Sequence, residues 1–114
     1  MGRLAACLVV VVATAMGAAA AEANPASDPD LAEAQRRFQR ATELYAENNL
    51  GAALAEFRKA YSLSPNYRVL YNIGQVCYLL DDSPCAYTAF SDYLEQGSDE
   101  IGDKRREEVR RDLA

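Results

Sequence analysis

The sequence predicts an all-α fold built from antiparallel helical hairpins. After residue 30, apolar residues recur every three or four positions, which is the spacing of one face of a helix. Turn-forming residues interrupt this pattern repeatedly, so the helices are short and turn back on one another. The pattern also recurs at a constant offset, so that Ala41 corresponds to Gly74 and Phe57 to Phe90, which indicates a duplicated unit. A chain of 114 residues is long enough for one such small domain.

The segment 1–21 is predicted to be an export signal. A positive charge at Arg3 precedes an uncharged run from Leu4 to Met16, and the residues from Gly17 to Ala23 are small except for Glu22. This order is typical of a Sec-type signal peptide, because the apolar run enters the translocon and small side chains fit the peptidase. We therefore expect residues 1–21 to be a signal peptide cleaved after Ala21 or Ala23. We also expect the protein to be bacterial and to be periplasmic or secreted.

The same segment also has features of a membrane anchor and of a lipoprotein signal. The stretch from Leu4 to Ala21 is near the lower limit of length for a membrane span, so an uncleaved anchor stays open. Membrane contact is expected only through this segment, if it stays uncleaved. The run Leu4-Ala5-Ala6-Cys7 is similar to a lipoprotein lipobox, but there the apolar stretch precedes the cysteine. We therefore assign Cys7 to the signal peptide.

Composition argues against catalysis. The chain has no histidine, which excludes most hydrolase triads and ordinary zinc sites. Removal of the signal would take one of the 12 basic residues and none of the 17 acidic ones, leaving a net charge of −6. An acidic chain without a basic stripe is poorly suited to nucleic acid or anionic lipid. We expect no enzymatic activity, no cofactor and no metal.

The first hairpin follows a short polar segment. Residues 22–30 lack periodicity and are expected to be a flexible lead-in, with Asp28-Pro29-Asp30 capping the first helix. That helix is expected from about Leu31 to Glu47, where Asn48-Asn49 ends it. The second is expected from about Leu50 to Leu63, where Ser64-Pro65-Asn66 ends it.

The second hairpin has the same plan. Its first helix is expected from about Val69 to Leu80. Asp81-Asp82-Ser83 then offers capping oxygens before a helix from Pro84 to Gln96. Gly97 is expected at the C-cap of that helix, where a left-handed backbone favours glycine.

A fifth, mostly charged helix is expected from about Asp103 to Leu113. Only Val109 and Leu113 are apolar in it, so its packing face is weak. Two interpretations of residues 99–114 stay open. The segment is a solvated capping helix, or it is the start of a truncated third repeat.

Seven similar residue pairs share one offset along the chain, and the small ones explain how the helices could approach. Small residues in both helices of a hairpin let the two backbones come close. Phe57 and Phe90 are then expected to fill the space between neighbouring hairpins. The pairs are Ala41/Gly74, Leu44/Cys77, Tyr45/Tyr78, Asn49/Asp82, Ala53/Ala86, Phe57/Phe90 and Tyr61/Leu94.

The spacing of these residues forms a recognisable motif in each unit. The first unit reads Ala41-x-x-Leu44-Tyr45, Ala53-x-x-x-Phe57, Ala60 and Pro65; the second reads Leu70-x-x-Ile73-Gly74-x-x-Cys77-Tyr78 and Ala86-x-x-x-Phe90.

This motif resembles the tetratricopeptide repeat (TPR). The resemblance covers residues 31–98 as two units, about 34–66 and 67–98. It implies a short right-handed α-solenoid of two repeats plus a C-terminal helix. It also implies a non-catalytic scaffold that binds a peptide or protein partner in a concave groove. The alternative is an N-terminal structural or oligomerisation segment of a larger cell-envelope protein, with self-association.

The resemblance also assigns the groove residues. In such proteins the first helices of successive hairpins line the groove, where amides pair with a peptide backbone and tyrosine rings supply contact area. The tyrosines at 45 and 78 could instead simply pack along their hairpins. The positions implied are Phe38, Gln39, Thr42 and Tyr45 in the first unit, and Tyr71, Asn72, Gln75 and Tyr78 in the second.

Cys77 and Cys85 lie eight positions apart, on either side of the expected turn. Antiparallel helices there can bring the two Cβ atoms to bonding distance. A disulfide is therefore predicted, with two buried free thiols as the main alternative. A metal site or a reactive thiol is a weaker alternative. The metal site is weak because two cysteines alone supply too few ligands. In the chain-entropy model, a disulfide that closes a loop of this size contributes about 2.6 kcal/mol.

Overall fold

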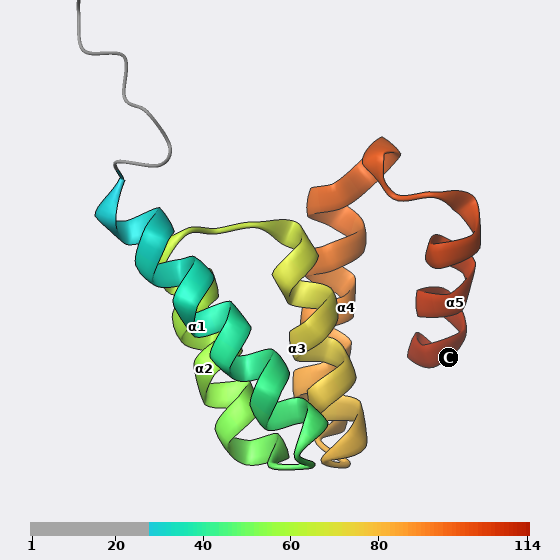
Figure 1. Cartoon of the computed structure of the whole chain (residues 1–114). Helices are drawn as coiled ribbons and strands as arrows, with labels where there is room; N and C mark the ends of the chain where they lie inside the picture. Colours follow the sequence, from blue (N-terminus) through green and yellow to red (C-terminus); the bar gives the residue numbers. More distant parts are fainter. Residues whose placement is uncertain (1–27) are drawn as a thin grey trace, which may run out of the picture.

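The computed structural model describes residues 28–114, and this part of the chain is entirely helical apart from its turns (Figure 1). The predicted signal peptide and all but the last residues of the predicted lead-in lie outside the described residues. The elements are α1 (Pro29–Ala46), α2 (Leu50–Leu63), α3 (Tyr67–Leu79), α4 (Ser83–Gly97), the 3₁₀ turn η2 (Ser98–Glu100) and α5 (Asp103–Leu113).

The helices pack as adjacent pairs. α1 packs along α2 and α3 along α4, while α2 joins the two hairpins by packing on α3. α5 packs on α4. Both hairpin turns lie at one end of the molecule (Figure 1). α5 runs towards that end, so its chain direction is the same as that of α3. An all-α arrangement of antiparallel hairpins is thereby confirmed.

The two hairpin turns have the same backbone conformation at equivalent positions of the two units. Asn48 and Asp81 both have a positive φ, of 59° and 56°. The next residue in each turn, Asn49 or Asp82, donates its N–H to a carbonyl five residues earlier, at 2.8 and 2.9 Å. Asparagine and aspartate tolerate the left-handed region better than most residues, which explains why they end these helices.

Side-chain caps explain where the helices begin. The carboxylate of Asp28 accepts the N–H of Asp30 at 2.9 Å, and that of Asp82 accepts the N–H of Cys85 at 3.2 Å, as the sequence predicts. The bounds predicted for α2 and α5 are confirmed. α3 begins two residues earlier than expected, because the side chain of Asn66 caps it by accepting the N–H of Arg68.

The predicted role of Gly97 is wrong. Gly97 is the last residue of α4, with a φ of −76°, and the positive φ of 42° belongs to Ser98. A Cβ at position 97 would collide with the side chains of Ile101 and Tyr67. Glycine is therefore required there for close packing, not for a left-handed backbone.

Each of the two buried phenylalanines contacts the first helix of its own hairpin. The ring of Phe57 meets that of Phe38 edge-on, with centroids 5.4 Å apart. The ring of Phe90 lies against Gly74, where an added Cβ would be 2.5 Å from two ring carbons. The small residue in α3 therefore makes room for this ring.

α5 is held by few side chains. Val109 is fully buried, and Ile101, just before the helix, is also buried. The guanidinium of Arg105 lies over the ring of Tyr71, 4.3 Å from its centroid, and hydrogen-bonds to its hydroxyl. Arg106 donates to the backbone carbonyl of Ser98. A mostly charged helix thus docks through Val109, the partly buried Leu113 and two arginines.

None of the helices in residues 28–114 is both long and apolar enough to cross a membrane.

Candidate functional site

The structure divides the predicted groove residues among three separate hollows. Phe38 lines an apolar hollow where α1 begins, and Tyr71 and Asn72 line another near the start of α5. Tyr45, Gln75 and Tyr78 line a third hollow, which among these three is the one that joins predicted residues of both units. The remaining two predicted positions, Gln39 and Thr42, are exposed and line none of these hollows.

Tyr71 is largely committed to contacts within the protein. Its ring packs against those of Phe90 and Tyr93, with centroids 6.1 and 5.4 Å away. Its hydroxyl accepts the side-chain N–H of Gln75 at 2.7 Å, and it also bonds to Arg105. Loss of Tyr71 would therefore disturb the fold as well as any binding surface.

Because Tyr71 is partly buried and Tyr93 is buried, the stability of the fold is expected to fall at alkaline pH. Burial raises the pKa of both hydroxyls above the ordinary value, and the nearby charge of Arg105 opposes this rise. Because these pKa values are raised by folding, their contribution to stability is complete below about pH 10. It is lost as the pH rises from there through the raised values.

Urea unfolding followed by circular dichroism should therefore show a stability that falls above about pH 10. In Arg105→Gln, the pKa of Tyr71, measured by ultraviolet absorbance, should rise further, because an opposing positive charge is gone. A fall in that pKa would contradict the position of α5 described above.

The exposed large apolar side chains are concentrated at the end of the molecule that carries the hairpin turns. In residues 28–114 they belong to the last residues of α1, the last residues and C-cap of α3, and the first turns of α4. They are Tyr45, Tyr78, Leu79, Leu80 and Tyr87, with exposed fractions of 39%, 57%, 51%, 41% and 62%.

Two adjoining hollows lie among these side chains, and we call them together the turn-end trough. Tyr78 and Asp112 line both hollows, so they form the boundary between them. The smaller, of about 200 Å³, is lined by Tyr45, Gln75, Tyr78, Leu79, Phe90 and Asp112. The larger, of about 420 Å³, is lined by Tyr78, Asp81, Ser83, Ala86, Tyr87, Asp112, Leu113 and Ala114.

The charge lining the trough is entirely negative. Asp81 and Asp112 contribute carboxylates, and no lysine or arginine of the described chain lines either hollow. Within residues 28–114, neither aspartate takes part in an ion pair, whereas Arg105 is paired with Glu108. The trough is therefore an aromatic surface with uncompensated negative charge.

Sequence reasoning missed most of this site. The resemblance pointed to the first helices alone, but Tyr87 comes from α4 and Asp112 from α5. One signal was available: Leu79 and Leu80 extend the apolar run of α3 beyond its buried stripe. Consecutive apolar residues at a helix end cannot all face the core, so some must be exposed.

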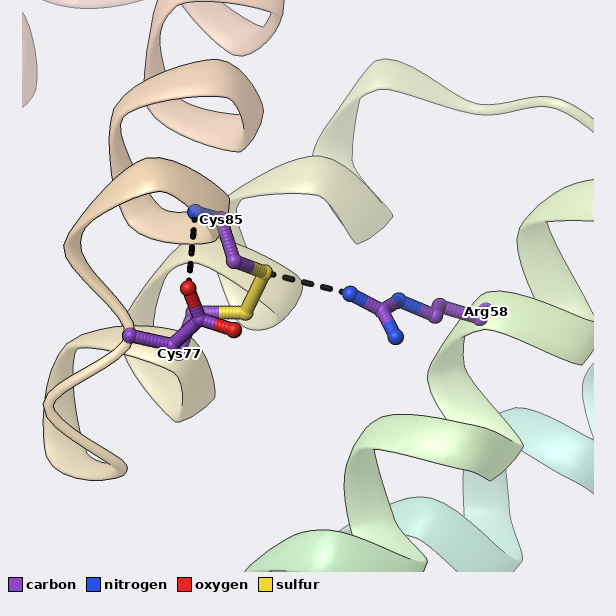
Figure 2. Close-up of a disulfide and its surroundings, with 4 residues drawn as sticks. Arg58, Cys77 and Cys85 are labelled. Atoms are coloured by element: carbon purple, nitrogen blue, oxygen red, sulfur yellow. Dashed lines mark hydrogen bonds between the residues drawn. A yellow bond between two sulfur atoms is a disulfide. The ribbon is translucent and has the colours of Figure 1, made fainter.

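A disulfide between Cys77 and Cys85 closes the turn that carries part of the trough (Figure 2). It joins the last turns of α3 to the first turn of α4, with Cα atoms 5.7 Å apart. Arg58 reaches across from α2 and donates a hydrogen bond to the sulfur of Cys85 at 3.3 Å. The disulfide thus restrains Tyr78 and Tyr87, which lie one and two residues from its cysteines.

No cluster of metal-ligating side chains occurs in the part of the chain that the structure describes.

Comparisons with known protein families, curated proteins and solved structures found no match for this chain.

Proposed function

We propose that this chain is an exported, non-catalytic interaction module of two TPR-like repeats, acting in the periplasm or outside the cell. In this proposal it binds a protein or peptide partner. The observation that carries the proposal is the concentration of exposed tyrosine and leucine side chains around the turn-end trough. Scattered exposed apolar residues need no explanation, but a contiguous group of them on a small domain is typical of an interaction site.

The shape and chemistry of the trough suit a peptide. It is shallow and divided by Tyr78, so it offers places for two neighbouring side chains. Tyrosine contributes a large contact area with little loss of rotamer freedom, and its hydroxyl can bond to a peptide backbone. Three of the predicted groove residues, Tyr45, Gln75 and Tyr78, line the smaller hollow. We propose that these three contact the partner.

Site-specific photo-crosslinking tests this proposal. A benzophenone amino acid at position 78 should yield a crosslinked partner in cells that produce the protein. The matched control carries the same group at Ser62, an exposed position on α2 that does not line the trough. In the position-78 protein, Tyr45→Ser and Tyr87→Ser should weaken the adduct.

Equal adducts from positions 78 and 62, or none from position 78, would contradict a partner at the trough.

The alternative function is packing or oligomerisation within a larger envelope protein. One observation favours it: a hollow of about 410 Å³ near the start of α1 has an apolar lining that includes Leu31, Phe38 and Val69. An adduct of twice the protein's own mass, with sedimentation as a dimer, would support this alternative over a separate partner.

A further inference from the structure

We propose that the turn-end trough receives a lysine or arginine side chain of a partner peptide, held between the ring of Tyr78 and the carboxylate of Asp112. This inference rests on the proposed function and specifies the chemistry of the partner. Both residues line both hollows, so a side chain entering either hollow meets them.

The protein already holds one cation in this way, between the same two helices. Arg105 of α5 lies over the ring of Tyr71 of α3, 4.3 Å from its centroid, and bonds to its hydroxyl. The guanidinium also pairs with Glu108, at 3.4 Å. A tyrosine on α3 and a carboxylate on α5 thus share one arginine.

The same pair of residue types recurs further along both helices. Tyr78 follows Tyr71 by seven residues, or about two turns, so it returns to nearly the same face of α3. Asp112 follows Glu108 by four residues, or about one turn of α5. Since the two helices run in the same direction (Figure 1), the second pair lies nearer the hairpin turns.

At this second pair the chain does not supply the cation. One turn after Arg105 the residue is Val109, which is fully buried and holds α5 in place. No basic side chain of residues 28–114 lines the trough, and Asp112 takes part in no ion pair there. A cation from a partner would therefore take the place between Tyr78 and Asp112 that Arg105 takes between Tyr71 and Glu108.

The neighbouring side chains define the rest of the partner. The exposed ring of Tyr78 can attract a cation by its π-face, and Asp81 adds negative charge to the larger hollow. Leu79 and Leu113 line the two hollows on either side. The peptide that fits is thus a lysine or arginine flanked by apolar residues.

Three peptides that differ in one side chain test this. The probes are acetyl-Gly-Leu-Xaa-Leu-Gly-amide with arginine, lysine or citrulline at Xaa, and citrulline is the neutral isostere of arginine. Nuclear magnetic resonance titration of the protein should show shifts at Tyr78, Leu79 and Asp112 with the two cationic peptides. Their affinity should exceed that of the citrulline peptide by about tenfold or more and should fall with added salt.

Two variants separate the effect of the Asp112 carboxylate from that of an equal charge outside the trough. Asp112→Asn should weaken the arginine peptide about tenfold while leaving the citrulline peptide unchanged. Asp99→Asn removes an equal charge from an exposed position that does not line the trough, and it should leave both affinities unchanged. Because both aspartates are exposed, both variants should fold.

Equal binding of the arginine and citrulline peptides at the trough would overturn the cation site and leave an apolar docking site. Absence of binding by all three peptides, or shifts located elsewhere, would also overturn it. The proposed function fails separately, if position 78 gives no crosslinked partner.

Discussion

Replacing Phe90 by alanine is expected to destabilise the fold by about 3–5 kcal/mol, which is a large part of the stability of a domain this small. The ring is 1% exposed and packs against Gly74 and Tyr71, so its removal leaves a cavity between α3 and α4. Urea unfolding monitored by circular dichroism would measure the loss. A change below about 1 kcal/mol would contradict a close fit around this ring.

The fit can be tested from the opposite side with Gly74→Ala. In an exposed helix this change stabilises by about 1 kcal/mol, but here the new methyl group would lie 2.5 Å from two carbons of Phe90. Overpacking of this kind costs about 1–3 kcal/mol, so a net loss is expected. In a Phe90→Leu background the loss should shrink, because the rigid ring is gone. Gly51→Ala, where no atom lies within 4 Å of an added Cβ, is the matched control and should stabilise.

Loss of the disulfide is expected to have the second largest effect. The bond between Cys77 and Cys85 closes a short loop, for which the chain-entropy model gives about 2.6 kcal/mol. Cys85→Ala should lower the free energy of unfolding by about this amount. Cys85 is the better residue to replace, because Cys77 is fully buried and its truncation would add a packing defect.

Reduction of the original protein with dithiothreitol provides the control. It should reproduce the loss seen in Cys85→Ala, and Cys85→Ala itself should not respond to the reductant. If the original protein has the same free energy of unfolding with and without the reductant, the disulfide does not stabilise the fold and the prediction is contradicted.

The helices and their ends were predictable because they depend on residues close together in the chain. The stripe that includes Ala41 and Leu44 identifies α1, and capping by Asp28 and Asp82 follows from the preference of short polar side chains for helix starts. The pairing of Cys77 with Cys85 was predictable for the same reason, since a tight turn brings its flanks together.

The close packing was less predictable. Gly97 looked like a C-cap because glycine favours a left-handed backbone, but the structure uses it to admit Ile101. Likewise, only the structure shows that the ring of Phe57 meets Phe38 and that the ring of Phe90 meets Tyr71. In both cases the deciding neighbour is a specific side chain that no periodicity identifies.

For residues 28–114, the sequence by itself determined the order and approximate ends of the α-helices, because a helical period and local caps are properties of short segments. Only the tertiary structure decided that the expected groove is divided, with Tyr71 occupied by Arg105 and Tyr78 left open beside Asp112. The physical reason is that α5 carries one buried valine and is positioned by long-range contacts to α3 and α4. Those contacts join residues far apart in the chain, such as Tyr71 and Arg105, so the spacing within any one helix does not encode them.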